Sequence, residues 1–425
     1  MKLPAATAFS ACCATAALAM SLAAPTVFAQ AAAAPAASAA SAPAFAVRPE
    51  VGAALNQTIE LFRGGKTAEA KARLEQAQAG IQALQPAEVT VMHRIRGLLE
   101  MQLEQHAAAV KSFESALAVG AQTPQDALQC QESLARAHFN LKAYPVAAEA
   151  ARKAQAAGSQ APAVQSVLVR ATYLQNDHAG TIKLLQAQQQ RDGKLAVDDL
   201  RILASSYGQA KDDANYVRLA ETLLRDHGRS EYWPDLMSRV QRQAGWQPRW
   251  DIDVYRLRLQ LDQMDEADDY LVLADMASKA GLPAEAQKVL DAGFAKGLLG
   301  KGSAAAEHNR LRAAVTRQAS DDRQSLSAAA ARPPAVGDAR AANSTFTTGA
   351  ALVSAGQAER GLELMKAALG GTLPDGAQAR LQYAQALAQA GRAAEAAEAF
   401  KAVAGHEQLG LLARLWALAV APKKS

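Results

Sequence analysis

The six-residue stretch GKTAEA at residues 65–70 recurs as GLPAEA at 281–286 and as GRAAEA at 391–396. Two further stretches, at 176–181 and 356–361, keep the same spacing, although the first begins with Asn and the second ends with Gly. Gly and Asn tolerate the left-handed backbone conformation that ends many helices. Five copies of one turn in one register therefore predict a chain built from repeated pairs of helices.

The last residue of each copy is an anchor from which the other repeats can be aligned. Successive anchors are 34 to 39 residues apart, except for two gaps of 70 and 75 residues. The eight anchors are Ala70, Ala109, Ala147, Thr181, Tyr216, Ala286, Gly361 and Ala396. Apolar residues follow most anchors at four and seven positions, which predicts a buried stripe on the second helix of each pair. Small residues twelve positions earlier predict a close approach of the two helices, at Gly97, Ala135, Ala204, Ala274, Gly349 and Ala384.

The composition also favours closely packed helices over β-sheets. Half of the 425 residues (50%) are hydrophobic, yet the chain has only 9 Phe, 8 Tyr and 4 Trp. Sheets prefer aromatic and β-branched side chains, whereas alanine favours helices. The 45 basic and 41 acidic residues leave a net charge of +4. So small an excess does not predict binding to nucleic acid, and it predicts only indirect contact with a membrane.

From about residue 51 to residue 405 the chain resembles tetratricopeptide repeat (TPR) proteins. One unit matches four positions of the TPR motif, at Gly97, Ala109, Phe113 and Ala116. The motif's tyrosine is mostly absent, several units are longer than the motif, and the unit around 246–255 fits poorly. The resemblance implies an all-α fold, a right-handed α-solenoid of about nine TPR-like helical hairpins. The alternative is an unrelated helical bundle with coincidental spacing.

The chain divides into five segments by composition. Residues 1–29 are expected to be a cleaved signal peptide, because Lys2 precedes an apolar run and a small residue, Ala29, ends the segment. This predicts a periplasmic protein. Residues 30–48, rich in Ala and Pro, are expected to be a disordered linker. The remainder is predicted to comprise a TPR-like array at 49–315, an irregular charged and Pro-containing linker or hinge at 316–344, and hairpins with a capping helix at 345–425.

The sequence contains no complete catalytic or metal-binding motif. The loop at 297–303 lacks the Ser or Thr that would follow Lys301 in a phosphate-binding loop. The seven histidines show no paired ligand spacing, and the acidic cluster at 262–269 lacks the glycine of a calcium loop. We therefore expect a protein that is not an enzyme, with no cofactor, no metal and no small-molecule substrate. Its partners are expected to be proteins.

The hairpin register places a set of arginine, aromatic and amide side chains on the concave surface that the first helices would line. These residues are Arg94, Arg136, Phe139, Asn140, Arg170, Tyr173, Arg201 and Gln209. Guanidinium groups pair with carboxylates and aromatic rings offer flat apolar contacts, so the set predicts a groove for a peptide or partner protein. The alternative is that the arginines are ordinary solvated helix surface. The set does not match the two-lysine, two-asparagine clamp of chaperone-binding TPR proteins.

The irregular unit carries three aromatic residues, Trp246, Trp250 and Tyr255. They predict either a docking patch for a partner or the core of an imperfect repeat. The sequence leaves both open.

The short motifs between Tyr232 and Gly297, and their order along the chain, are similar to those of exported TPR proteins described as associated with TonB energy-transduction systems. That resemblance implies an accessory of a TonB-type transport system, with TonB or inner-membrane motor components as partners. Two other functions stay open. One is a periplasmic assembly factor or chaperone for envelope or cytochrome precursors, and the other is a regulator of cell-wall enzymes.

Overall fold

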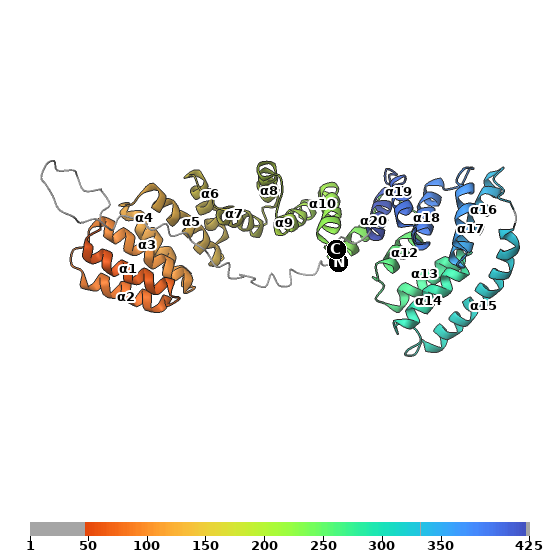
Figure 1. Cartoon of the computed structure of the whole chain (residues 1–425), viewed down its shortest axis with the longest axis horizontal. Helices are drawn as coiled ribbons and strands as arrows, with labels where there is room; N and C mark the ends of the chain where they lie inside the picture. The colour runs from red at the N-terminus through yellow and green to blue at the C-terminus, as the bar shows by residue number, and fades with distance from the viewer. Residues whose placement is uncertain (1–46, 332, 422–425) are drawn as a thin grey trace. The chain divides into compact units, whose positions relative to one another are not determined.

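The computed structural model describes residues 47–331 and 333–421. These residues form 20 α-helices and two short 3-10 helices, with no strand in the described ranges (Figure 1). The all-α class of TPR-like hairpins predicted from the sequence is confirmed. The predicted signal peptide (1–29) and all but the last two residues of the predicted linker (30–48) lie outside the described residues.

The chain forms two compact units, which meet in sequence between Cys130 and Gln131. In the first unit, α1 pairs with α2 and α3 pairs with α4. Their bounds are α1 (Pro49–Arg63), α2 (Thr67–Gly80), α3 (Pro86–Gln102) and α4 (His106–Val119). The core of this unit includes Leu55, Leu74 and Leu99. Helix α5 (Pro124–Asn140) contains the boundary between the two units.

The second unit contains the remaining helices and most of the aromatic core. Its first part is α6 (Tyr144–Ala156), α7 (Pro162–Leu174), α8 (His178–Asp192), α9 (Val197–Gln209), α10 (Asp213–His227), α11 (Trp233–Gln241) and α12 (Asp251–Gln260). Its second part is α13 (Ala267–Lys279), α14 (Pro283–Ala295), α15 (Ala305–Ala330), α16 (Ala339–Ser354), α17 (Ala358–Ala368), α18 (Gly376–Gln389), α19 (Ala393–Lys401) and α20 (Gly410–Val420).

The repeated turn and its anchors are as the sequence predicts. Every anchor is buried and lies in the second helix of its pair, in α2, α4, α6, α8, α10, α14, α17 and α19. The first residue of the turn takes a left-handed conformation, with φ of 76° at Gly65, 60° at Asn176 and 74° at Gly281. Positive φ explains why Gly and Asn recur at this position.

The small residues also lie where two helices approach closely. A Cβ atom added to Gly349 in α16 would lie 2.6 Å from the carbonyl oxygen of Gly361 in α17. A Cβ atom added to Gly97 would instead lie 2.7 Å from the ring of Phe113, which is a side chain. Contact with backbone leaves less room for adjustment than contact with a side chain, so Gly349 is the more restricted of the two positions.

We expect Gly349→Ala to destabilise the second unit by about 2–3 kcal/mol, because α16 and α17 must separate to admit the methyl group. Gly80→Ala is the matched control, since a Cβ atom at Gly80 meets nothing within 4 Å. That variant should be neutral or slightly stabilising. Urea unfolding followed by helicity measures both changes. Equal midpoints for the two variants would contradict the close packing of α16 on α17.

The segment 316–344 differs from its prediction as an irregular linker. Helix α15 is 26 residues long and continues to Ala330, and α16 already begins at Ala339. Only 331 and 333–338, among the described residues between them, are non-helical. The helix is held by Val315, Ala319 and Leu326, which are buried at helical spacing while charged side chains cover its exposed faces. The prediction of an irregular linker is therefore wrong for most of this segment.

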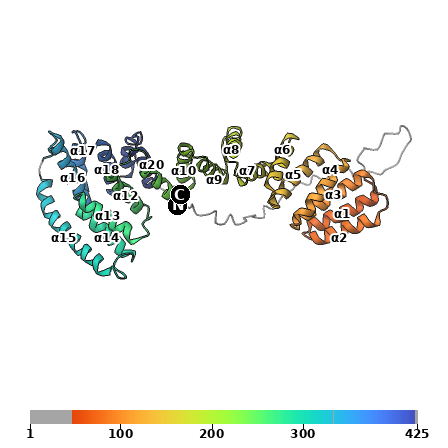
Figure 2. The same ribbon diagram turned by 180° about the vertical axis from the view of Figure 1, so that it is seen from behind.

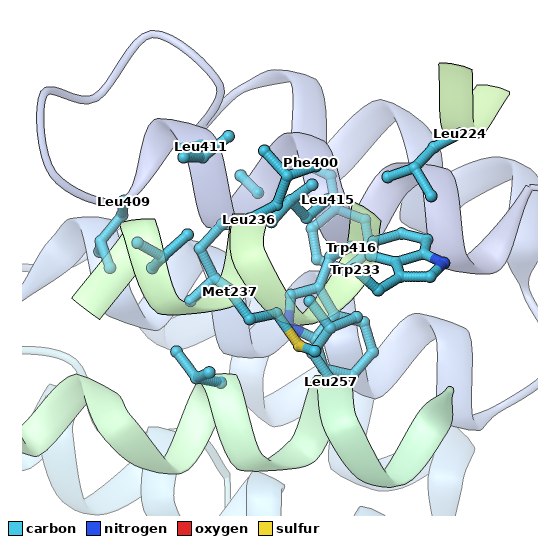
Figure 3. Close-up of a cluster of buried hydrophobic side chains, with 14 of the residues drawn as sticks. Leu224, Trp233, Leu236, Met237, Leu257, Phe400, Leu409, Leu411, Leu415 and Trp416 are labelled. Carbon is cyan, nitrogen blue, oxygen red and sulfur yellow. The ribbon is translucent and has the colours of Figure 1, made fainter. Parts of the chain in front are cut away.

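The C-terminal helix folds back onto the middle of the second unit. Besides packing on α19, α20 contacts α10, α11 and α12, and α12 lies beside α18 and α20 in both ribbon views (Figures 1 and 2). Leu415 and Trp416 share one core with Leu236 of α11 and Leu257 of α12 (Figure 3). The irregular unit at 230–262 is thus completed by helices from the end of the chain. Helix α20 is more than the cap of the last hairpin that the sequence predicts.

Candidate partner-binding surfaces

Most of the predicted groove residues lie on three consecutive first helices of the second unit. Helix α5 carries Arg136, Phe139 and Asn140, helix α7 carries Arg170 and Tyr173, and helix α9 carries Arg201 and Gln209. The hydroxyl groups of Tyr173 and Ser205 are hydrogen-bonded at 2.8 Å, which places α7 directly against α9. Asn140, Arg170 and Gln209 are exposed, and the other four are half-buried. The predicted groove residues therefore lie on successive first helices, and α7 and α9 are in direct contact.

The predicted arginines differ in how far they are already engaged. Arg201 lies 3.8 Å from Asp198 and 3.9 Å from Glu231, so it matches the alternative of a paired surface residue. Arg94 belongs to the first unit, where it pairs with Asp126, and burial lowers the pKa of its guanidinium. Arg136 and Arg170 form no ion pair within 4 Å with any described residue, although the charge of Arg170 acts on Asp199 of α9. Those two remain the best candidates for binding a partner's carboxylates.

Three exposed apolar side chains lie next to these residues and are not among those that the repeat pattern predicts. Leu141 is 42% exposed, Val146 47% and Leu174 44%. They lie at the turn ends of adjacent hairpins, where the side chain of Gln175 donates a hydrogen bond to the carbonyl oxygen of Tyr144 at 3.3 Å. We call this surface the apolar edge; it comprises Leu141, Val146 and Leu174 with half-buried Phe139, Tyr144 and Tyr173.

A signal for the apolar edge is present in the sequence. In the repeated turn GKTAEA the fifth residue is Glu69, and the equivalent residue is Glu285 or Glu395 in the other two closest copies. Val146 occupies that position in the hairpin of α5 and α6. Glu69 and Glu395 are exposed at this position, so an exposed apolar residue in their place indicates a surface adapted for contact.

The predicted docking patch is divided between core and surface. Trp250 is only 4% exposed, and its indole nitrogen donates a hydrogen bond to Asp375 at 2.9 Å. Trp246 is half-buried, lies edge-on to Trp250 and donates to Asp251 at 2.9 Å. Tyr255 is half-buried against a different core cluster. A docking patch that includes Trp250 is therefore wrong, because this tryptophan is buried in the core and its indole N–H is bonded to Asp375, just before α18.

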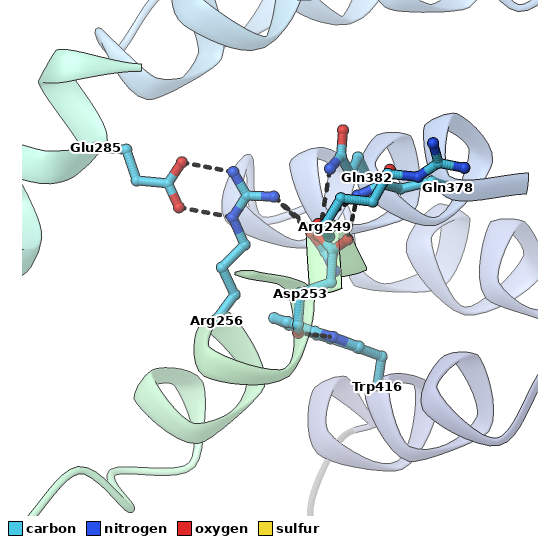
Figure 4. Close-up of polar contacts among 8 residues, drawn as sticks. Arg249, Asp253, Arg256, Glu285, Gln378, Gln382 and Trp416 are labelled. Atoms are coloured by element: carbon cyan, nitrogen blue, oxygen red, sulfur yellow. Dashed lines mark hydrogen bonds and ion pairs between the residues drawn. The ribbon is translucent and has the colours of Figure 1, made fainter. Parts of the chain in front are cut away.

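A buried polar network joins α12 to α14, α18 and α20 (Figure 4). Asp253 is 0% exposed and accepts hydrogen bonds from Arg256 at 2.9 Å and Gln378 at 3.0 Å. Arg256 donates two further hydrogen bonds to Glu285, each of 2.7 Å. Burial raises the pKa of Asp253, and the charge of Arg256 opposes that rise. The indole of Trp416 donates to the backbone carbonyl of Asp253 at 3.0 Å. The groups satisfy one another inside the protein, so the network is structural.

The described residues contain no group of three or more His, Cys, Asp or Glu side chains that could hold a metal ion. Burial raises the pKa of Cys130 to about 11, which keeps its thiol protonated at neutral pH. Within the described ranges, no helix combines the length and apolar character needed to cross a bilayer.

No protein-family model and no curated protein matches this chain. Among solved structures it is similar to a TPR protein from Parabacteroides merdae, with 12% identity, a TM-score of 0.36, and coverage of 76% of this chain and 93% of that one. It is also similar to TPR-like repeats of a kinesin light chain from Podospora anserina, with 19% identity, a TM-score of 0.32, and coverage of 40% of this chain and 92% of that one. A third similar structure is the type IV pilus biogenesis factor PilW, with 14% identity, a TM-score of 0.30, and coverage of 44% of this chain and 97% of that one. Because identities and scores are low, the TPR-like assignment rests on the turns and buried anchors of this chain itself.

Proposed function

We propose that this protein is a periplasmic scaffold that binds a segment of a partner protein along α5, α7 and α9. The apolar edge is the observation that carries the proposal. Of the six large hydrophobic side chains exposed in the described part of the chain, three belong to this edge. Exposed apolar side chains gathered on neighbouring elements are typical of protein–protein contact sites.

The chemistry of the surface suggests what the bound segment contains. Leu141, Val146 and Leu174 would contact an apolar side chain of the partner, and aromatic rings flank them. Arg136 and Arg170 would pair with carboxylates beside that apolar residue. The proposed ligand is thus a protein segment with an apolar anchor and neighbouring acidic residues.

The cellular setting rests on the sequence. The expected signal peptide at 1–29 supports the periplasm. The resemblance of residues 232–297 to TonB-associated TPR proteins supports a role as an accessory of a TonB-type envelope transport system. Under this proposal the bound segment belongs to TonB or to a component of its inner-membrane motor.

Site-specific photo-crosslinking in cells tests the proposal. A photoreactive amino acid at position 146 should capture one protein, identified by mass spectrometry, whereas the same amino acid at the equivalent position 69 should not. TonB or motor components support the proposed role. Unfolded envelope or cytochrome precursors would instead indicate an assembly factor, and cell-wall synthases would indicate a regulator. Equal labelling at 69 and 146 would exclude the apolar edge as the binding surface.

Val146→Glu gives the edge the carboxylate that other repeats carry at this position. We expect the variant to fold normally and to bind the crosslinked partner about tenfold or more weakly, because a charge replaces an apolar contact and repels acidic neighbours. Glu69→Val is the reciprocal control and should leave affinity unchanged. Isothermal titration of the purified proteins measures both affinities. Unchanged affinity in Val146→Glu would contradict the assignment.

A further inference from the structure

A second surface, separate from the apolar edge, is formed where the C-terminal helix closes on the middle of the second unit. A cleft of about 850 Å³ lies between α10, the end of α11, and the segment that leads into α20. Val217 of α10 and Leu411 of α20 contribute apolar side chains to it. Because α20 forms one wall, this cleft exists only when the end of the chain is packed on α10 and α11.

Four guanidinium groups and three carboxylates line the cleft. Two pairs are already formed inside it, one between Arg239 and Asp213 and the other between Arg414 and Glu221, whose atoms are 2.9 Å apart. Each pair links two elements of the cleft wall, and the two charges within each pair cancel. The charge available to a ligand in the cleft therefore comes from the groups that form no such pair.

The remaining guanidinium groups belong to Arg218 and Arg242. Both are exposed and line the cleft, Arg218 from α10 and Arg242 from the turn after α11, and neither forms an ion pair with a described residue. The remaining carboxylate is that of Glu407, which is exposed at the rim formed by the segment before α20. The unpaired charge of the cleft is therefore positive by one unit.

His406 is hydrogen-bonded to the backbone of the segment that leads into α20. Its Nδ1 atom accepts hydrogen bonds from the backbone N–H groups of Gln408 and Leu409, at 3.3 and 3.2 Å. The side chain lines the cleft, and these bonds hold it against the segment before α20.

We infer that this cleft binds an acidic segment of a partner protein. Arg218 and Arg242 bind carboxylates of that segment, and Val217 and Leu411 contact an apolar side chain between them. Carboxylates suit guanidinium groups because the fork of N–H donors matches their two oxygens. A segment with acidic residues around a leucine supplies both kinds of contact. Glu407 opposes binding and limits the acidic charge that the cleft accepts.

A fluorescein-labelled peptide of sequence ELDELD is the probe, titrated into the full-length protein and followed by fluorescence anisotropy. The double variant Arg218→Gln, Arg242→Gln should bind the probe about tenfold more weakly. The control Arg310→Gln, Arg340→Gln removes two exposed arginines elsewhere in the second unit and should bind as the unchanged protein does. Equal weakening in both double variants would show a general charge effect and would overturn the inference.

Glu407→Gln provides a change of opposite sign. Removal of the opposing carboxylate should strengthen binding of the probe about two- to threefold, a gain that damage to the fold would not produce. The basic peptide KLKKLK should bind neither the unchanged protein nor any of these variants. Inorganic polyphosphate should not displace the ELDELD probe from the unchanged protein. Displacement by polyphosphate, or an unchanged affinity in Glu407→Gln, would contradict recognition of an acidic peptide.

The two surfaces can be tested independently. Val146→Glu should leave binding of ELDELD unchanged, and Arg218→Gln with Arg242→Gln should leave crosslinking at position 146 unchanged. Failure of one proposal therefore does not decide the other.

Discussion

Trp416→Ala is expected to destabilise the second unit by about 3–5 kcal/mol, the range for deletion of a buried aromatic side chain. The indole is 3% exposed, stacks on Phe400 with ring centroids 5.8 Å apart, and donates a hydrogen bond to the carbonyl of Asp253. Its loss removes apolar contacts, leaves a cavity and leaves a buried carbonyl without this donor. Helix α20 should then separate from α10, α11 and α12.

The remaining tryptophans report this change directly. Trp233 and Trp250 belong to the same core cluster as Trp416, and Trp246 packs against it. Denaturant unfolding of Trp416→Ala followed by fluorescence should show a lower midpoint, and limited proteolysis should cut before α20. Trp416→Phe is the control, because it keeps a ring and loses the indole N–H, so it should cost roughly half as much or less. A Trp416→Ala midpoint equal to that of the unchanged protein would show that α20 does not hold the unit closed.

Arg256→Met is the second change with a large expected effect, about 3–5 kcal/mol of destabilisation near neutral pH. The methionine fills much of the same volume but leaves Asp253 buried without its counter-charge and Glu285 without its two hydrogen bonds. Arg258→Met is the matched control on the same helix. Its pair with Asp269 is partly exposed, so its loss should cost about 1 kcal/mol or less.

The cost of Arg256→Met should also depend on pH. Burial raises the pKa of Asp253 above its unfolded value, so the folded state binds the proton more tightly than the unfolded state does. The stabilising contribution of protonation is present below the unfolded pKa and is lost as pH rises through the folded pKa. Without Arg256 the folded pKa rises further, because the charge that opposes the rise is gone. Arg256→Met should therefore be less destabilising at about pH 5 than at about pH 7.5. A cost independent of pH would mean that Asp253 is not buried as a lone carboxyl in the variant.

The sequence predicts the hairpins well because their signals are local. The left-handed turn residue, the buried anchor and the apolar stripe lie within one helix pair, and backbone sterics and helical periodicity decide each of them. The positions of Arg136, Arg170 and Tyr173 on first helices follow from the same register. Whether these residues bind a partner stays a prediction.

The local signals fail where the partners are distant in the chain. The sequence leaves open whether Trp250 is surface or core, and the structure decides for the core because Asp375, just before α18, accepts its hydrogen bond. Segment 316–330 looks irregular because Val315, Ala319 and Leu326 are few among charged and small residues, and α14 is the helix against which α15 packs. Nothing in the periodicity of either segment specifies which element will cover it.

The amino-acid sequence by itself determined a chain of TPR-like helical hairpins and the residues that face their cores. Only the tertiary structure decided that α20 returns to α10–α12, that Asp253 and Arg256 become buried, and that a cleft opens beside Arg218 and Arg242. The physical reason is that helices and turns depend on neighbours three to four residues away, whereas burial depends on which distant helix excludes the water.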